Sequence, residues 1–223
     1  KAGLFSPSFN PLWTPDLSDI NIPDFNETHK ALFMSREAGA ELIYVPFKEW
    51  LELSVGVFNR TGVFAQNTNN AKAVTAHLKT KFPLGSWTLF LGTGNYILRQ
   101  SDPGSVNYKS NTISDIFLGL ESPSSRTQLV FDGFFGEMDD SVRSLSPRGG
   151  SVIATLGVNS WLGIFGRYEY STESPILNGC LRQLQAGPEI YFDDNVKSFI
   201  TYTQLEAGGM VDKTLMIRLR LNI

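Results

Sequence analysis

The sequence contains very little cysteine, histidine and charge, and each shortage narrows the range of functions. Its single cysteine, Cys180, cannot form an intramolecular disulfide and is expected to be a buried thiol. Two histidines, His29 and His77, form no Cys/His cluster with metal-ligand spacing. Charged residues make up 18% of the chain, against roughly 25% in an ordinary soluble domain. We therefore expect no metal, no cofactor and no enzymatic activity.

Strong charge of one sign and long apolar helices are also missing. The formal charge of −3 and a pI near 5.4 give no general attraction to nucleic acid, so no nucleic-acid partner is expected. One uncharged stretch, residues 149–166, approaches the length of a membrane-spanning helix. It is rich in glycine and interrupted at Asn159 and Ser160, so it is better interpreted as two strands joined by a turn. No secretory signal pattern follows Lys1, which leaves a mature form, a fragment or a cytoplasmic chain open.

Apolar residues instead recur at every second position, which is typical of β-strands with two different faces. At the end of the chain Leu215, Ile217 and Leu219 alternate with residues that include Arg218 and Arg220. Clear alternation also occurs in segments 51–58, 74–82, 114–121 and 162–170, and weaker runs are 39–47, 87–99, 127–137, 152–158, 184–192 and 196–204. These segments predict about eleven strands of an antiparallel, transmembrane all-β barrel, and a short strand at 2–6 would make twelve.

The connections between the predicted strands support the same interpretation. Short turns are expected at 46–49, 82–85, 159–160 and 193–195, and longer polar connections at 59–70, 100–111, 139–150, 171–179 and 206–212. Short and long connections alternate, as they do in outer-membrane barrels with short periplasmic turns and long external loops. We expect residues 1–223 to form one domain. Its first 38 residues would be a strand followed by a long loop, or by an arm that binds a partner chain.

Several segments resemble the phosphate-selective porin O and P family of bacterial outer-membrane channels. The residues that carry the resemblance are GLFSPSF at the start, REAGAELIYVPFKEWLELSVGVFNRTG, AKAVTAHLKTKFPLGSWTLFLGTGNY and FGRYEYS. The resemblance implies an outer-membrane location, a trimer and a larger barrel to which this chain contributes the later strands. Two features depart from the pattern: the chain ends in Ile223, where outer-membrane barrels usually have Phe, and it has no dense arginine ladder.

The predicted function is passive diffusion of small hydrophilic solutes, with a mild preference for anions suggested by Arg218 and Arg220. Charges on the strand face opposite the aliphatic residues would line the pore, and the candidates are Lys79, Lys81, Glu121, Glu137, Arg167, Glu169, Glu189, Arg218 and Arg220. Membrane lipid and small solutes are the expected partners. Two alternatives remain: a non-conducting scaffold barrel with partner subunits in an envelope complex, and a soluble all-β binding domain.

Overall fold

The computed structural model describes residues 1–5, 37–47, 50–59, 72–99, 110–139, 144–174, 179–193 and 196–221. In these residues the chain is almost entirely β-structure, with one short 3-10 turn at Pro123–Ser125. The strands are β1 (Ala2–Phe5), β2 (Glu37–Phe47), β3 (Leu51–Asn59), β4 (Lys72–Leu84), β5 (Trp87–Arg99), β6 (Ser110–Ser122), β7 (Thr127–Asp139), β8 (Ser144–Leu145), β9 (Arg148–Gly157), β10 (Leu162–Ser174), β11 (Gly179–Tyr191), β12 (Val196–Ala207) and β13 (Met210–Leu221). The predicted all-β fold is confirmed.

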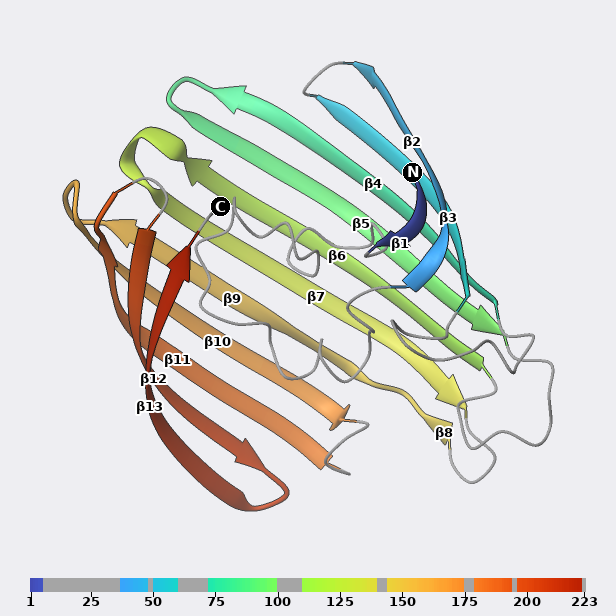
Figure 1. Ribbon diagram of the computed structural model, residues 1–223. Coiled ribbons are helices and arrows are strands. Elements are labelled where there is room, and N and C mark those ends of the chain that lie inside the picture. Colours follow the sequence, from blue (N-terminus) through green and yellow to red (C-terminus); the bar gives the residue numbers. More distant parts are fainter. Residues whose placement is uncertain are drawn as a thin grey trace.

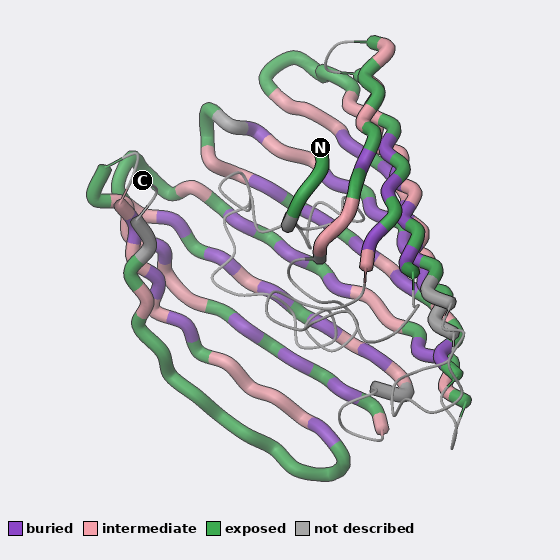
Figure 2. Tube along the Cα trace, turned by 45° about the vertical axis from the view of Figure 1, so that its right-hand side comes forward, coloured by how far each residue is buried: buried purple, intermediate pink, exposed green. Residues whose placement is uncertain are grey.

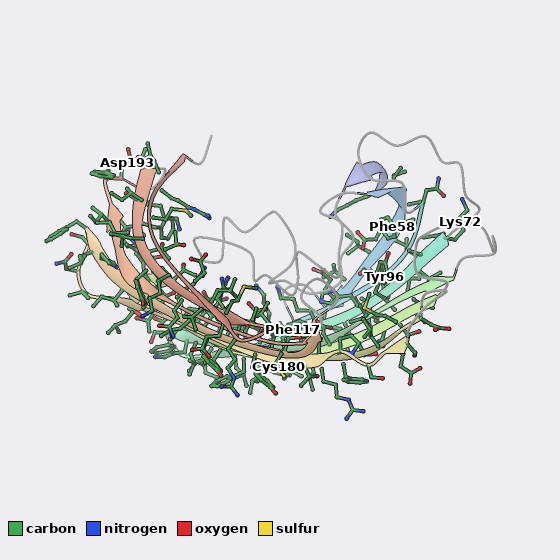
Figure 3. The ribbon with its side chains drawn as sticks, turned by 90° about the horizontal axis from the view of Figure 1, so that it is seen from below. Phe58, Lys72, Tyr96, Phe117, Cys180 and Asp193 are labelled. Atoms are coloured by element: carbon green, nitrogen blue, oxygen red, sulfur yellow. The ribbon has the colours of Figure 1, made fainter. Side chains whose placement is uncertain are left out.

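The strands form one antiparallel sheet whose order follows the chain (Figure 1). Each strand pairs with the next from β1 to β13, except that β7 pairs with both β8 and β9. The sheet curves into a trough, as the view along it shows (Figure 3). Among the described residues β1 and β13 do not pair with each other, so they are the two edges of an open sheet.

Tight turns join the strand pairs β4–β5, β6–β7 and β9–β10 at one end of the sheet. At the opposite end the connections are longer, with two exceptions. The prediction of a long connection at 171–179 is wrong, because β10 runs to Ser174 and β11 begins at Gly179. The prediction of a long connection at 206–212 is wrong, because β12 runs to Ala207 and β13 begins at Met210. The turn between them is Gly208–Gly209, and both glycines have positive φ, 56° and 82°. Glycine adopts this conformation without the steric cost that other residues meet.

The uncharged stretch 149–166 forms most of β9 and the first part of β10, as the sequence predicts. The Asn159 side chain makes the turn, because its Oδ1 accepts hydrogen bonds from the backbone N–H of Trp161 at 2.9 Å and of Leu162 at 2.8 Å. An asparagine that bonds to the backbone two and three residues ahead is a typical turn former. In the described part of the chain no helix has the length and apolar character needed to cross a membrane.

Burial alternates residue by residue along the strands (Figure 2). Phe117 lies on the concave side of the trough and Cys180 on the convex side (Figure 3). Residues paired directly across two strands share a face, which assigns the remaining positions. One row of cross-strand partners that contains Phe117 is Lys79, Gly92, Phe117, Asp132, Ser151, Glu169 and Gln183. We call this side the concave face and the opposite side the convex face.

Candidate functional site

The concave face is polar although it is the buried face. Side chains on the inside of a curved sheet converge, so they screen one another from solvent. The buried polar and charged residues of this face are Glu41, Ser54, Thr75, His77, Asp115, Gln128, Asp132, Ser151, Thr155, Arg167, Glu169, Ser171, Gln183, Gln185, Glu189, Lys197 and Thr201. Phenylalanines lie between them, among them Phe90, Phe117, Phe165 and Phe199.

The convex face carries the large aliphatic and aromatic residues, and these are exposed. On β13 the exposed fractions are 71% for Leu215, 74% for Ile217 and 64% for Leu219. Other exposed members are Leu42, Leu53, Val55, Val57, Val74, Leu91, Ile116, Leu118, Phe131, Phe135, Val152, Leu156, Ile164, Tyr168 and Leu184. The sheet therefore has the reverse of the usual soluble arrangement, in which apolar residues are buried and polar residues exposed.

Most of the predicted pore-lining residues share the concave face. Alternation and register place seven of them there: Lys79, Lys81, Glu121, Arg167, Glu169, Glu189 and Arg218. Arg220 lies opposite Lys197 in the register of β12 and β13, and its side chain is outside the described residues.

Glu137 is the exception, because it lies on the convex face. It is exposed next to the buried Met138, on the same side of β7 as Phe131 and Phe135. The segment 127–139 has phenylalanine on both faces, since Phe134 is buried on the concave side. Hydrophobic alternation in the sequence therefore did not assign the side of Glu137 correctly.

A ladder of polar side chains crosses the centre of the concave face. Asp132, Ser151, Glu169 and Gln183 are direct cross-strand neighbours on β7, β9, β10 and β11. The Ser151 hydroxyl donates to Asp132 Oδ1, and Arg167 Nη2 donates to Gln183 Oε1 at 3.0 Å. Arg167 is 2% exposed and Glu169 is fully buried. Buried charges of this kind need polar partners, and Gln183 supplies one to Arg167.

Cations and aromatic rings gather where β11 and β12 meet at the tight-turn end of the sheet. The Tyr191 hydroxyl donates to Glu189 Oε2 at 2.5 Å. The Arg126 guanidinium lies 4.3 Å from the Tyr191 ring centroid, and Lys197 Nζ lies 6.0 Å from the same centroid. Lys197 Nζ is also 5.3 Å from the Phe199 ring. The sequence did not predict Arg126, Tyr191 or Lys197 as lining residues, because they become neighbours only through the pairing of separate strands.

Glycines of the concave face provide room for aromatic rings from neighbouring strands. A Cβ added to Gly92 would overlap the Phe117 ring, and one added to Gly119 would overlap the Phe90 ring. The sequence predicts that Gly92 eases curvature or makes room in a lumen, and the structure gives the specific partner. These pairs cover the glycine backbone with an aromatic ring, a device that supports curved sheets.

His77 and Cys180, the two residues with reactive side chains considered above, lie on opposite faces of the sheet. His77 is buried on the concave face and stacks on Phe117 with ring centroids 5.8 Å apart. Cys180 is exposed on the convex face, so the expectation of a buried thiol is wrong. Its Sγ lies 4.0 Å from the Tyr170 hydroxyl. The described residues hold no group of three or more His, Cys, Asp or Glu that could bind a metal.

Comparison with known proteins identified no relative of this chain. No protein-family model matches the sequence, and no curated protein matches it significantly. The resemblance to the phosphate-selective porin family therefore stays a prediction.

Proposed function

We propose that this chain forms part or all of the wall of a bacterial outer-membrane β-barrel that lets small hydrophilic solutes diffuse passively. One observation carries the proposal: the same strands present aliphatic residues on the convex face and charged residues on the concave face. A barrel in lipid has an apolar exterior and a polar interior. A soluble barrel has the opposite arrangement.

Exposure of the convex face to water would be unfavourable. Burying one large aliphatic side chain contributes about 1.5–3 kcal/mol, and monomeric soluble proteins rarely expose contiguous apolar patches beyond a few hundred Å². Strand length supports lipid as the covering material. Strands of 12 or 13 residues, such as β5 and β12, are about 40 Å long and cross about 30 Å when tilted by about 40°. This is the thickness of the hydrocarbon core.

The proposal requires both sheet edges to be paired. Hydrocarbon offers no hydrogen bonds, so each unsatisfied backbone group of β1 or β13 would cost several kcal/mol there. The edges would pair with each other, with further strands of a larger barrel, or with a partner subunit. A soluble binding domain would instead need a second layer over the whole convex face.

The polar concave face supports a wet lumen of mixed charge. Near the turn between β11 and β12, the three cations Lys197, Arg218 and Arg126 accompany Glu189. A local cluster of positive charge attracts anions, so we expect a mild anion preference.

A non-conducting scaffold barrel is the second candidate, and a specific observation favours it. Arg167 and Glu169 are almost completely buried, and Arg167 bonds to Gln183. A lumen filled by such polar ladders would stabilise a wall without passing solutes.

The test is reconstitution of the purified chain in planar bilayers. Detergent dependence together with discrete conductance steps is the expected result, with a reversal potential in a salt gradient that favours anions. Detergent dependence without conductance would favour the scaffold. A chain that stays monodisperse without detergent would contradict both membrane proposals.

A further inference from the structure

Five of the charged side chains on the convex face lie on one inclined line, and this line deepens the proposed function. On the described strands the convex face carries these charged side chains: Lys72, Glu137, Asp139, Arg148, Arg182, Glu206 and Lys213. All of them lie toward the end of the sheet opposite the tight turns. Below them, toward the tight turns, the described convex side chains on the same strands are uncharged.

The slope of the line can be expressed relative to a row of directly paired residues across the sheet. The row of cross-strand partners through Lys213 passes through Gln204, Leu184, Tyr168, Val152, Phe131, Leu118, Leu91 and Thr80. The number of residues between each charge and this row increases from β13 toward β4. Arg182 is two residues from Leu184 on β11. Arg148 is four residues from Val152 on β9.

The offset between charge and row keeps increasing on the strands farther from β13. Glu137 is six residues from Phe131 on β7, and Lys72 is eight residues from Thr80 on β4. Eight strand-to-strand steps separate β13 from β4 in the sheet order. The line therefore shifts by about one residue per strand.

This slope has a direct geometric meaning. Strands rise about 3.3 Å per residue and lie about 4.8 Å apart, so a shift of one residue per strand inclines the line by about 35° to the cross-strand rows. Strands of membrane barrels tilt by about 35–45° from the barrel axis. A plane perpendicular to that axis would cross such a sheet along a line of this slope.

We propose that this line is the border between hydrocarbon and lipid headgroups, and that the sheet sits in the bilayer with its strands tilted by about 35°. The border residues are Lys72, Glu137, Arg148, Arg182 and Lys213. Four of the five are cations, which complement the phosphate oxygens of headgroups. Tyr170, whose ring lies 5.9 Å from the Arg182 guanidinium, stands at the same border, where aromatic residues are enriched in membrane proteins.

The experiment uses spin labels on the convex face of the whole chain in phosphatidylcholine–phosphatidylglycerol vesicles. Single cysteines are introduced after Cys180→Ser, and depth is measured from accessibility to oxygen and to a water-soluble nickel chelate. In the first set, Leu78→Cys, Ala154→Cys and Leu219→Cys, each site lies six residues from the border residue of its own strand. These three labels should report one depth within about 3 Å, the axial rise of one tilted residue.

The second set is the matched control, because its members share one register row. Phe131→Cys, Val152→Cys and Leu184→Cys lie six, four and two residues from Glu137, Arg148 and Arg182 respectively. Their labels should become shallower in that order, by about 11 Å in total. All six positions avoid the concave face, so folding should be preserved.

The outcomes separate this inference from the proposed function on which it rests. Labels in lipid that show equal depth along the register row would overturn the border while leaving the membrane proposal intact. Labels that are all accessible to the nickel chelate would overturn both.

Discussion

The two faces of the sheet are made by the same strands and have opposite chemistry. On β10, Phe165, Arg167 and Glu169 point to the concave face, and Ile164 and Tyr168 point to the convex face. In a soluble protein the buried side would be the apolar one. Here curvature buries the polar side, and the apolar side remains exposed. Burial in this sheet therefore reflects its curvature and not the polarity of the side chains.

The largest effect should come from placing a charge on the convex face below the border. Ile164→Lys should destabilise the lipid-embedded protein by about 2–4 kcal/mol, the cost of lysine near the midplane of a membrane barrel. Thr172→Lys is the matched control on the same strand and face, near the border, where the cost is about 0–1 kcal/mol. Urea unfolding in vesicles measures both. Equal effects would remove the distinction between the interior and the border of the convex face.

A smaller effect should come from filling the space that concave glycines leave for aromatic rings. Gly119→Ala should destabilise by about 1–3 kcal/mol, because the new Cβ overlaps the Phe90 ring. Gly166→Ala is the control, because a Cβ there meets nothing within 4 Å. Alanine at that position should be neutral or slightly stabilising, since glycine weakens strands. If Gly119→Ala were as stable as Gly166→Ala, the Phe90 ring would not need this space.

The polar ladder should contribute less than the packing of the rings. Arg167→Ala removes the hydrogen bond to the buried Gln183 amide and should cost about 1–2 kcal/mol. Arg182→Ala on the exposed convex face should change stability by less than about 0.5 kcal/mol. The comparison is made by urea unfolding in detergent micelles. A larger loss at Arg182 would contradict the assignment of the two faces.

The smallest expected effect is on ion selectivity, and it should occur without a loss of stability. The double substitution of Lys197→Gln with Arg218→Gln should move the reversal potential in a salt gradient toward cation preference, because it removes positive charge from the concave face. Lys213→Gln on the convex face should leave the reversal potential unchanged. An identical shift from Lys213→Gln would mean that the concave charges do not line the conducting path.

The sequence predicted the strands where alternation is strict, as in segments 51–58, 74–82 and 215–221. It failed where the two faces carry similar residues. Phe131, Phe134 and Phe135 obscure the alternation on β7, which is why Glu137 was assigned to the lining face. It also missed the Gly208–Gly209 turn, because the charged residues Glu206 and Asp212 and the two glycines together were interpreted as a longer loop.

The sequence by itself determined that this protein is built from antiparallel strands with one aliphatic and one polar face, since the two-residue period is a local property of the backbone. Only the tertiary structure decided which residues become neighbours. Register is set by hydrogen bonds between distant segments, so the ladder from Asp132 to Gln183 and the inclined line from Lys72 to Lys213 have no counterpart in any single segment. Curvature likewise arises from the whole sheet, and it makes the polar face the buried one.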